Sequence, residues 1–521
     1  LQNTDRAAVK AYAATAGATA TINQATLTYA APAPFTAAFS SRGPLLAGAG
    51  DLLKPDVIAP GQDILAAVAP PGSAGRDFNL YSGTSMSSPH VAGLAALLMQ
   101  LHPDWTPMMI KSALMTSAYD VLDASVSDAT RAFRQGAGHV KPNSAADPGL
   151  VYNAGWNNWL AFLCGTTSGV GASTCSALEA AGYSLDPSDL NVASIAIGAL
   201  PGVQTVTREV TNVGTGTATY TASYTGMAGF NVVISPASLT LDPGQTKAFQ
   251  VAFTRTTADV NAYTGGQLTW TDGLHNVRIP MVVQPVALAA PTEVWGTGAP
   301  LSYDVSFGYN GSFAAQARGL VPATTFEGSV KTDPTGTFSP VASPYTASFE
   351  VVVPADATYA RFSLFDANTT PDSDLDLYVY DSAGEQVGSS GGGTSDEEVN
   401  LVDPPADTYT VWVHGFNTSD PSTFTLFTWV LGSTAAGNMT VTASASATLG
   451  GAGAVNISFS DLTAGIKYLG SVAYDGMSGL PDPTIVRVDP NLDIDGALTQ
   501  TALSPVVTKG SDIDVNVTAT N

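Results

Sequence analysis

Gly83–Gly93 reads GTSMSSPHVAG, and this stretch decides how the rest of the chain is interpreted. It places Ser85 two residues after Gly83 and immediately before a predicted helix. A serine in that place lies beside the unpaired N–H groups and the positive end of the helix dipole, which favour negative charge developing on a substrate oxygen. A serine that merely caps a helix has the same pattern. On this local pattern alone, a nucleophile and an N-cap both remain open.

Two helices are predicted close to this serine. From Ser88 to Leu101, apolar residues recur every three or four positions, as a stripe facing a core requires. The next helix is predicted to begin with Thr106 as N-cap and Pro107 at its first helical position. The apolar run Ile64–Val68 is short and compatible with β-structure, which predicts a strand covered on both faces. The first part of the chain is therefore interpreted as α/β.

The whole Gly83–Gly93 string resembles the nucleophile motif of the subtilisin-like serine proteases, and the likeness continues on both sides. The neighbouring stretches that carry it are Phe39–Pro44, Leu53–Gly61, His102–Trp105, Lys111–Thr116, Gly136–Val140 and Asp147–Tyr152. The last two are similar to the end of the catalytic domain in the large plant-type and pyrolysin-like branch. The resemblance implies an α/β doubly wound parallel-sheet catalytic domain, of which residues 31–155 are the C-terminal part.

The resemblance also implies a chemistry for Ser85. In this family the serine attacks the peptide carbonyl, a histidine takes its proton and an aspartate orients that histidine, in the chain order Asp, His, Ser. Ser85 would then form the acyl-enzyme, with its backbone N–H in the oxyanion hole. The motifs expected around the other two residues, D-[ST]-G and H-G-T-H, do not occur in residues 1–84. We therefore expect the parent protein to be a serine endopeptidase and this chain alone to be inactive.

None of the five histidines is expected to replace the missing base. No histidine precedes His90, and His90 lies inside the helix that leads away from the serine, so its ring is expected to point into packing. The others occupy structural positions in the family pattern or distant β regions: His102, His139, His275 and His414.

The segments around the catalytic part also have interpretations. Residues 1–30 resemble the return from a protease-associated domain, and an opening without initiator Met or signal core predicts that the chain begins at a cut. Residues 156–185 are expected to be a linker. Its Cys164 and Cys175, with ten residues between them, are predicted to form a disulfide if the protein is exported. Two cysteines without a neighbouring histidine make a poor zinc site.

The remainder of the chain is predicted to be all-β sandwich domains. Residues 186–286 alternate at period two between turn signals and resemble a fibronectin type III-like domain. Within them, Trp270–Gly273 ahead of Val277 predicts a hairpin. Residues 287–344 are expected to connect this domain to a second sandwich at 345–433, and residues 434–521 to form a further small β region and tail.

Residues 345–433 are similar to the bacterial pre-peptidase C-terminal domain, and their acidic residues raise the question of calcium. Carboxylates alternate along one predicted strand and recur in a later segment, and carboxylate oxygens are the ligands that Ca²⁺ prefers. A solvated acidic face is the alternative. The candidate ligands are Asp372, Asp374, Asp376 and Glu397, with Glu398 as a neighbour. No cofactor is expected for the chemistry itself.

Composition limits the partners. Lys and Arg total 19 against 43 Asp and Glu, so the formal charge of -24 repels phosphate backbones and argues against nucleic acid. No uninterrupted apolar run is long enough to span a bilayer. We expect a secreted, extracellular endopeptidase with protein or peptide substrates, and the oligomeric state stays open. The alternative is a non-catalytic β-sandwich binding or adhesion protein that carries a remnant of a protease domain.

Overall fold

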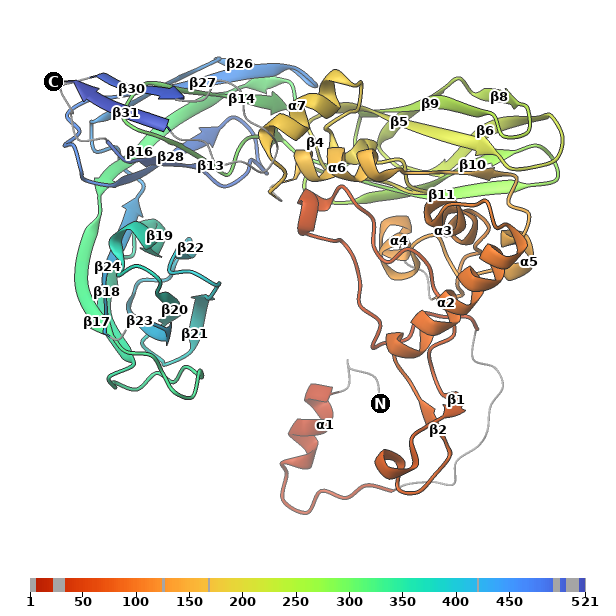
Figure 1. Ribbon diagram of the computed structural model, residues 1–521, viewed down its shortest axis with the longest axis horizontal. Coiled ribbons are helices and arrows are strands. Elements are labelled where there is room, and N and C mark those ends of the chain that lie inside the picture. The colour runs from red at the N-terminus through yellow and green to blue at the C-terminus, as the bar shows by residue number, and fades with distance from the viewer. Residues whose placement is uncertain are drawn as a thin grey trace.

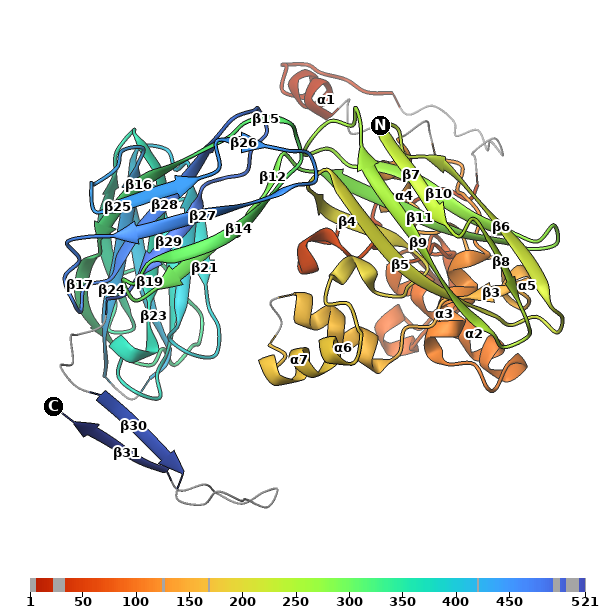
Figure 2. The same ribbon diagram turned by 90° about the horizontal axis from the view of Figure 1, so that it is seen from above.

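A helical unit comes first in the chain and three β-sandwiches follow it (Figure 1). The computed structural model describes residues 6–21, 33–123, 127–166, 169–418, 421–490, 497–502 and 515–520. Seen from above, the helical unit and the first sandwich form one mass, and the other two sandwiches form a second (Figure 2). Of the expected protease-associated return at residues 1–30, residues 1–5 and 22–30 lie outside the described residues.

The helices cluster before the sandwiches. They are α1 (Arg6–Ala13), α2 (Thr84–Leu101), α3 (Pro107–Thr116), α4 (Asp128–Gln135), α5 (Pro142–Ala145), α6 (Trp156–Gly165) and α7 (Ala172–Ala180), with short 3-10 turns at Ala47–Gly50, Pro70–Ser73, Pro187–Asp189 and Asp366–Asn368. Among the helices that the structure describes, none is long and apolar enough to cross a membrane.

Local sequence signals place the starts of α2 and α3. The Thr106 hydroxyl accepts a hydrogen bond from the Met109 N–H at 3.2 Å and Pro107 is the first helical residue, which confirms the predicted start of α3. Helix α2 begins at Thr84, earlier than predicted. The Gly83 carbonyl accepts from the N–H groups of Met86 and Ser87, so a first turn closes ahead of the proline in this helix.

The doubly wound sheet is not confirmed. In the described part of the helical unit, β1 (Ile64–Ala67) pairs only with β2 (Phe78–Tyr81), antiparallel, as a two-stranded ribbon. The expectation that residues 64–68 are covered on both faces is wrong, since the Leu65 side chain is 68% exposed. Apolar content predicted burial, but burial needs a layer of chain on each face, and no described element covers this ribbon.

The first sandwich joins two sheets, with strand orders β3-β5-β9-β7 and β4-β11-β10-β6-β8. The predicted hairpin is confirmed, because Trp270 and Thr271 pair with Val277 and Asn276 across an antiparallel turn. Trp270 is fully buried with its ring edge-on to Phe249, at 5.0 Å between centroids. The strands are β3 (Leu150–Val151), β4 (Ile195–Leu200), β5 (Val203–Asn212), β6 (Ala218–Gly226), β7 (Phe230–Ser235), β8 (Ser238–Leu241), β9 (Thr246–Arg255), β10 (Thr264–Thr271) and β11 (Asn276–Pro285).

The second sandwich has the sheet orders β17-β24-β19-β22 and β18-β23-β20-β21. Leu375, Leu377 and Val379 alternate inward from one strand and meet Val411 and Val413 from another in its core. Its strands are β17 (Thr324–Val330), β18 (Thr346–Val353), β19 (Ala357–Leu364), β20 (Asp374–Tyr380), β21 (Gln386–Ser390), β22 (Glu397–Val402), β23 (Asp407–Asn417) and β24 (Ser422–Gly432).

The third sandwich is built from two stretches that flank the second one in sequence. Its sheets have the orders β12-β14-β27-β25 and β13-β29-β28-β16, and β15 pairs with β26 alongside. The strands before the second sandwich are β12 (Leu288–Ala289), β13 (Glu293–Gly296), β14 (Leu301–Phe307), β15 (Gly311–Ser312) and β16 (Ala314–Pro322). Those after it are β25 (Met439–Ala443), β26 (Ser446–Ala447), β27 (Ala452–Phe459), β28 (Tyr468–Asp475) and β29 (Thr484–Val488). A separate pair follows, β30 (Ala497–Ala502) with β31 (Val515–Thr520).

Residues 287–344 are therefore not a connecting segment, which corrects the expectation. Ser302 pairs with Asn456 and Gln316 with Ala473, across the whole length of the second sandwich. Alternation along each strand predicts a half-buried strand but carries no information about a partner this far away. Parts of the expected tail, residues 491–496, 503–514 and 521, lie outside the described residues.

A buried arginine joins the second and third sandwiches. Arg361 on β19 is 3% exposed, and its guanidinium donates to both carboxylate oxygens of Glu293 on β13 and to Asn400. Glu398 lies 3.2 Å from the same guanidinium. These bonds raise the pKa of Arg361 even though burial alone would lower it. The pair is a fixed ionic contact between two separately built cores.

We expect Glu293→Ala to destabilise this contact strongly, because it leaves a buried guanidinium with weaker compensation. The free energy of unfolding should fall by about 3 kcal/mol. Urea unfolding followed by intrinsic fluorescence measures the loss. Glu385→Ala, which removes an exposed carboxylate of the second sandwich, is the control. Equal stability of the two variants would contradict the prediction.

A contact that changes with pH lies between the helical unit and the first sandwich. The Asp51 carboxylate accepts a hydrogen bond from the Gly198 N–H on β4 at 2.9 Å. Burial, helped by the charge of Asp186, raises the pKa of Asp51 to about 6. Because the folded pKa lies above the ordinary value, the stabilisation is complete below about pH 4 and is lost as the pH rises through 6.

Asp51→Asn is therefore expected to increase the free energy of unfolding at pH 8, by up to about 3 kcal/mol, and to change it little at pH 4. Urea unfolding at both pH values checks this. Asp304→Asn, an exposed carboxylate on β14, should have no comparable effect. If the variant and the parent chain have the same free energy of unfolding at both pH values, the charge on Asp51 does not destabilise the fold.

Candidate active site

Ser85 is the second residue of α2 and lies exposed at the helix N-terminus. Its turn is held by the neighbouring segment: the Gly83 N–H donates to the Gly61 carbonyl at 2.8 Å. The Ser87 hydroxyl donates to the Ala59 carbonyl at 3.0 Å. No contact among the described residues engages the Ser85 hydroxyl. The arrangement presents an available hydroxyl at the positive end of a long helix.

The approach of the two segments is unusually close at Gly61. A Cβ built on Gly61 would lie 2.1 Å from the Ser87 hydroxyl oxygen and 2.9 Å from the Gly83 carbonyl oxygen. Only a residue without a side chain fits there, so the Pro60–Gly61 segment and the serine turn can pack backbone against backbone. This packing sets the position of the Ser85 backbone N–H.

All five histidines have other partners, and none of their described contacts reaches Ser85. The His90 Nδ1 lies 2.8 Å from the Met86 carbonyl one turn earlier in its own helix. His102 bonds the Ala146 carbonyl and stacks on Trp105, and His139 bonds the Val140 carbonyl. The remaining two are each held between two carboxylates: His275 by Asp147 and Asp272, and His414 by Asp333 and Asp376.

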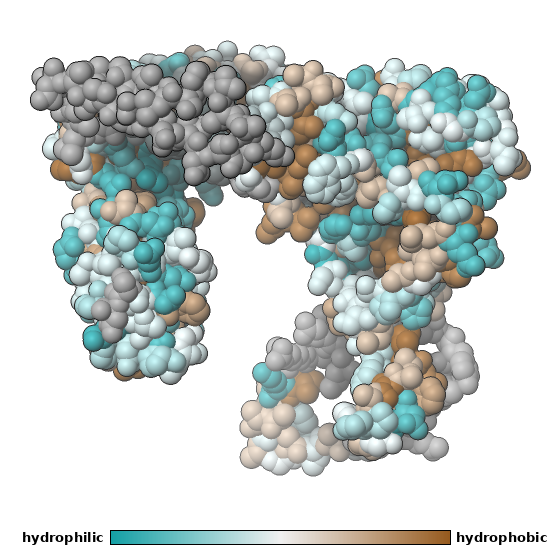
Figure 3. Space-filling model, viewed as in Figure 1, coloured by the Kyte–Doolittle hydropathy of each residue, from teal (hydrophilic) through white to brown (hydrophobic). Residues whose placement is uncertain are grey.

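A largely apolar cavity of about 740 Å³ lies beside the serine turn. Its walls include Phe35, Phe39, Ile58, Ser87, Val91 and His139. Apolar side chains also lie exposed on α2 and on the ribbon: Leu65, Phe78, Leu80, Leu97, Met99 and Leu101. Figure 3 shows hydrophobic surface gathered over this unit. Helix α2 therefore has an uncovered apolar face in addition to the face that packs on α3.

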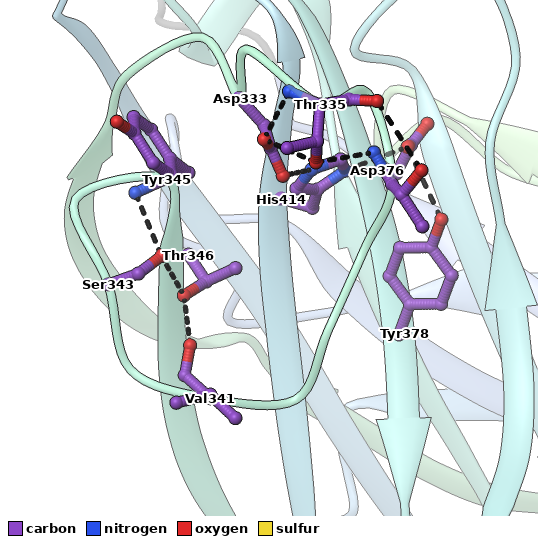
Figure 4. Close-up of polar contacts among 10 residues, drawn as sticks. Asp333, Thr335, Val341, Ser343, Tyr345, Thr346, Asp376, Tyr378 and His414 are labelled. Atoms are coloured by element: carbon purple, nitrogen blue, oxygen red, sulfur yellow. Dashed lines mark hydrogen bonds and ion pairs between the residues drawn. The ribbon is translucent and has the colours of Figure 1, made fainter.

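The four expected calcium ligands do not form a cage. Asp376 is buried, and its carboxylate lies 3.2 Å from the His414 Nδ1 (Figure 4). Glu397 is buried and accepts hydrogen bonds from the Ser390 hydroxyl and the Gly392 N–H. Burial and the nearby acidic groups raise the pKa values of Asp374 and Glu397.

In the ranges that the structure covers, no three His, Cys, Asp or Glu side chains could hold a metal ion. Asp376 is paired with His414 and Asp372 lies exposed, so calcium binding by these residues stays a prediction. Sequence spacing identified the acidic strand but missed His414 and Asp333. His414 lies 38 residues from Asp376 and 81 residues from Asp333 in the sequence. An unchanged melting temperature in calcium and in chelator would remove the calcium prediction.

A disulfide joins Cys164, at the end of α6, to Cys175 in α7, with the Cα atoms 5.7 Å apart. The expected linker is therefore a pair of helices closed by a covalent bond. Such a bond limits the unfolded chain more than the folded one, which stabilises the pair.

Comparison with known proteins agrees with the motifs. Residues 3–138 match the subtilase family, and residues 189–283 match the fibronectin type-III domain. The chain is 42% identical over 277 residues to Subtilisin-like protease SBT2.5 of Arabidopsis thaliana, covering 48% of this chain and 34% of that protein. It is 42% identical over 270 residues to Subtilisin-like protease SBT4.9 of the same plant, covering 48% and 37%.

The chain thus spans about a third of the length of these curated relatives. Among solved structures, Tripeptidyl Peptidase 2 matches with 12% identity and a TM-score of 0.24, over 75% of this chain and 32% of that one.

Gly61→Ala tests the close packing that places the serine turn. We expect a loss of about 1–3 kcal/mol in the free energy of unfolding, because the added methyl group meets the Ser87 hydroxyl and the Gly83 carbonyl. In a Ser87→Ala background the nearest contact is gone, so the same substitution should cost less. Chemical denaturation of the four-member cycle measures the difference. An identical cost in both backgrounds would mean that Ser87 is not the obstacle.

Proposed function

We propose that this chain, which carries a subtilase-family segment followed by a fibronectin type-III domain, is part of a secreted serine endopeptidase with Ser85 as its nucleophile. The observation that carries the proposal is the exposed, unengaged Ser85 hydroxyl at the N-terminus of α2, within a motif matched by the subtilase family. The curated relatives are named as proteases, which gives the expected substrates as proteins or peptides.

The chemistry follows from the position of the serine. The Ser85 oxygen attacks the peptide carbonyl, and the Ser85 backbone N–H at the helix terminus stabilises the negative oxygen of the intermediate. The C–N bond then breaks, the amine leaves with the proton taken from the hydroxyl, and water later hydrolyses the acyl-enzyme. Attack requires a base that takes the hydroxyl proton. The described residues supply none, since each histidine is engaged elsewhere. We infer that the base and its orienting carboxylate come from polypeptide other than these residues, and that this chain alone is inactive.

The uncovered apolar face of α2 supports this inference. Leu97, Met99 and Leu101 are each more than half exposed on a helix whose other face is buried against α3. A helix that is apolar on opposite faces is normally covered on both. Further chain packed on this face and on β1 would complete the core and could bring the base to Ser85.

Export is part of the same proposal. The Cys164–Cys175 disulfide is of the kind that persists in oxidising surroundings. The chain has 43 acidic and 19 basic residues, and such a negative net charge keeps a protein soluble in the presence of salt and disfavours binding to anionic polymers. The two C-terminal sandwiches would then be packing or substrate-holding modules. If the protein is instead a non-catalytic binding protein, no form of it will use Ser85.

A fluorophosphonate probe separates these possibilities. The isolated chain should not be labelled above the level of its Ser85→Ala variant, because no base activates the hydroxyl. In the full-length protein we expect labelling and hydrolysis of an unfolded protein substrate, with Ser85→Ala lowering turnover by about 10⁴-fold or more. Ser82→Ala in the same loop is the control. Labelling of the isolated chain at Ser85 would contradict its inactivity, and hydrolysis that survives Ser85→Ala would contradict the proposed nucleophile.

A further inference from the structure

His275 lies at the boundary between the helical unit and the first sandwich. It belongs to the turn between β10 and β11, and its Nδ1 is 2.8 Å from an Asp272 carboxylate oxygen in the same turn. Its Nε2 is 3.3 Å from a carboxylate oxygen of Asp147, which lies between α5 and β3 at the end of the helical unit. One imidazole therefore bridges the two parts of the molecule.

The bridge requires two protons on the imidazole. A carboxylate only accepts hydrogen bonds, and a neutral imidazole has a single N–H. Asp272 is held in its ionised form, because its Oδ1 accepts hydrogen bonds from the N–H groups of Leu274 and His275. These bonds and the imidazole lower the pKa of Asp272 to about 2, against the effect of burial. The neutral ring can keep its hydrogen bond to Asp272, but the ion pair with Asp147 at 3.3 Å exists only when His275 is charged.

The remaining groups around His275 leave the two carboxylates as its main partners. Lys141 from the helical unit and Arg278 from β11 line the same cavity of about 830 Å³. Arg278 is engaged by Asp120 at 2.7 Å. Tyr220 of β6 approaches from the sandwich side, near Gly149. Burial alone would lower the pKa of His275, but the bonds and charges of Asp272 and Asp147 outweigh it and raise the pKa.

We propose that His275 is a proton-controlled latch, which fastens the Asp147 turn to the first sandwich when the imidazole is protonated and releases it when the imidazole is neutral. Because the folded pKa is raised, the stabilisation is complete below about pH 6.5 and is lost as the pH rises through the folded value. The latch fixes the turn that leads directly into β3, the strand by which the helical unit joins the sheet β3-β5-β9-β7. Mildly acidic medium would close this boundary and alkaline medium would loosen it.

Asp51 also titrates at this boundary, so the test is made in an Asp51→Asn background, which removes the contribution of Asp51. Hydrogen exchange of residues 147–151 and 271–277, corrected for intrinsic rates, is compared at pH 5.5 and pH 8. Protection should fall on going to pH 8, by about tenfold for each unit by which the His275 pKa is raised. NMR titration of His275 in the same samples gives that pKa directly.

Two variants and a control decide the outcome. Asp147→Asn should lower the His275 pKa and flatten the pH dependence of protection, and His275→Gln should abolish that dependence while the sandwich stays folded. Asp304→Asn, an exposed carboxylate on β14, should leave both unchanged. The proposal is overturned if Asp147→Asn keeps the full pH dependence, or if His275 titrates at its ordinary value.

Discussion

One hydrophobic core holds the helical unit and the first sandwich together, and the remaining features of this half of the molecule depend on it. Met115 at the end of α3 and Ala137 beyond α4 pack in the same cluster as Trp270 and Ile279 of the sandwich. Between them runs β3, whose residues are fully buried and pair with β5. Because apolar burial is the largest favourable term in folding, the two parts fold as one body rather than as a domain and an appendage.

Polar contacts at this boundary act within the geometry that the core imposes. Asp120, which follows α3, accepts hydrogen bonds from Gln135, Gln267 and Arg278, and its pKa is lowered by them against burial. This contact stays ionised over the whole physiological range. Asp51 and His275 behave differently, since both favour a protonated form. The Asp120 contact therefore holds this boundary at every physiological pH, and the Asp51 and His275 contacts stabilise it further in acid.

The serine turn and the second and third sandwiches are held by different kinds of contact. At the turn, backbone approaches backbone at Gly61 and short-range hydrogen bonds decide the position of Ser85. In the second and third sandwiches, two separate cores meet through a small apolar seam and the bonded pair of Arg361 and Glu293. Such an interface depends on a few directional contacts, so single substitutions there are expected to have large effects.

The sequence by itself determined what short-range chemistry controls. The serine at the N-terminus of α2, the cap at Thr106 and the β10–β11 hairpin were all predictable, because each depends on residues a few positions apart. Only the tertiary structure decided the exposure of β1, the division of residues 287–344 between two sandwiches, and the partners of His275 and His414. These features require segments up to about 190 residues apart to meet, and alternation along a strand says which face is buried but not what covers it.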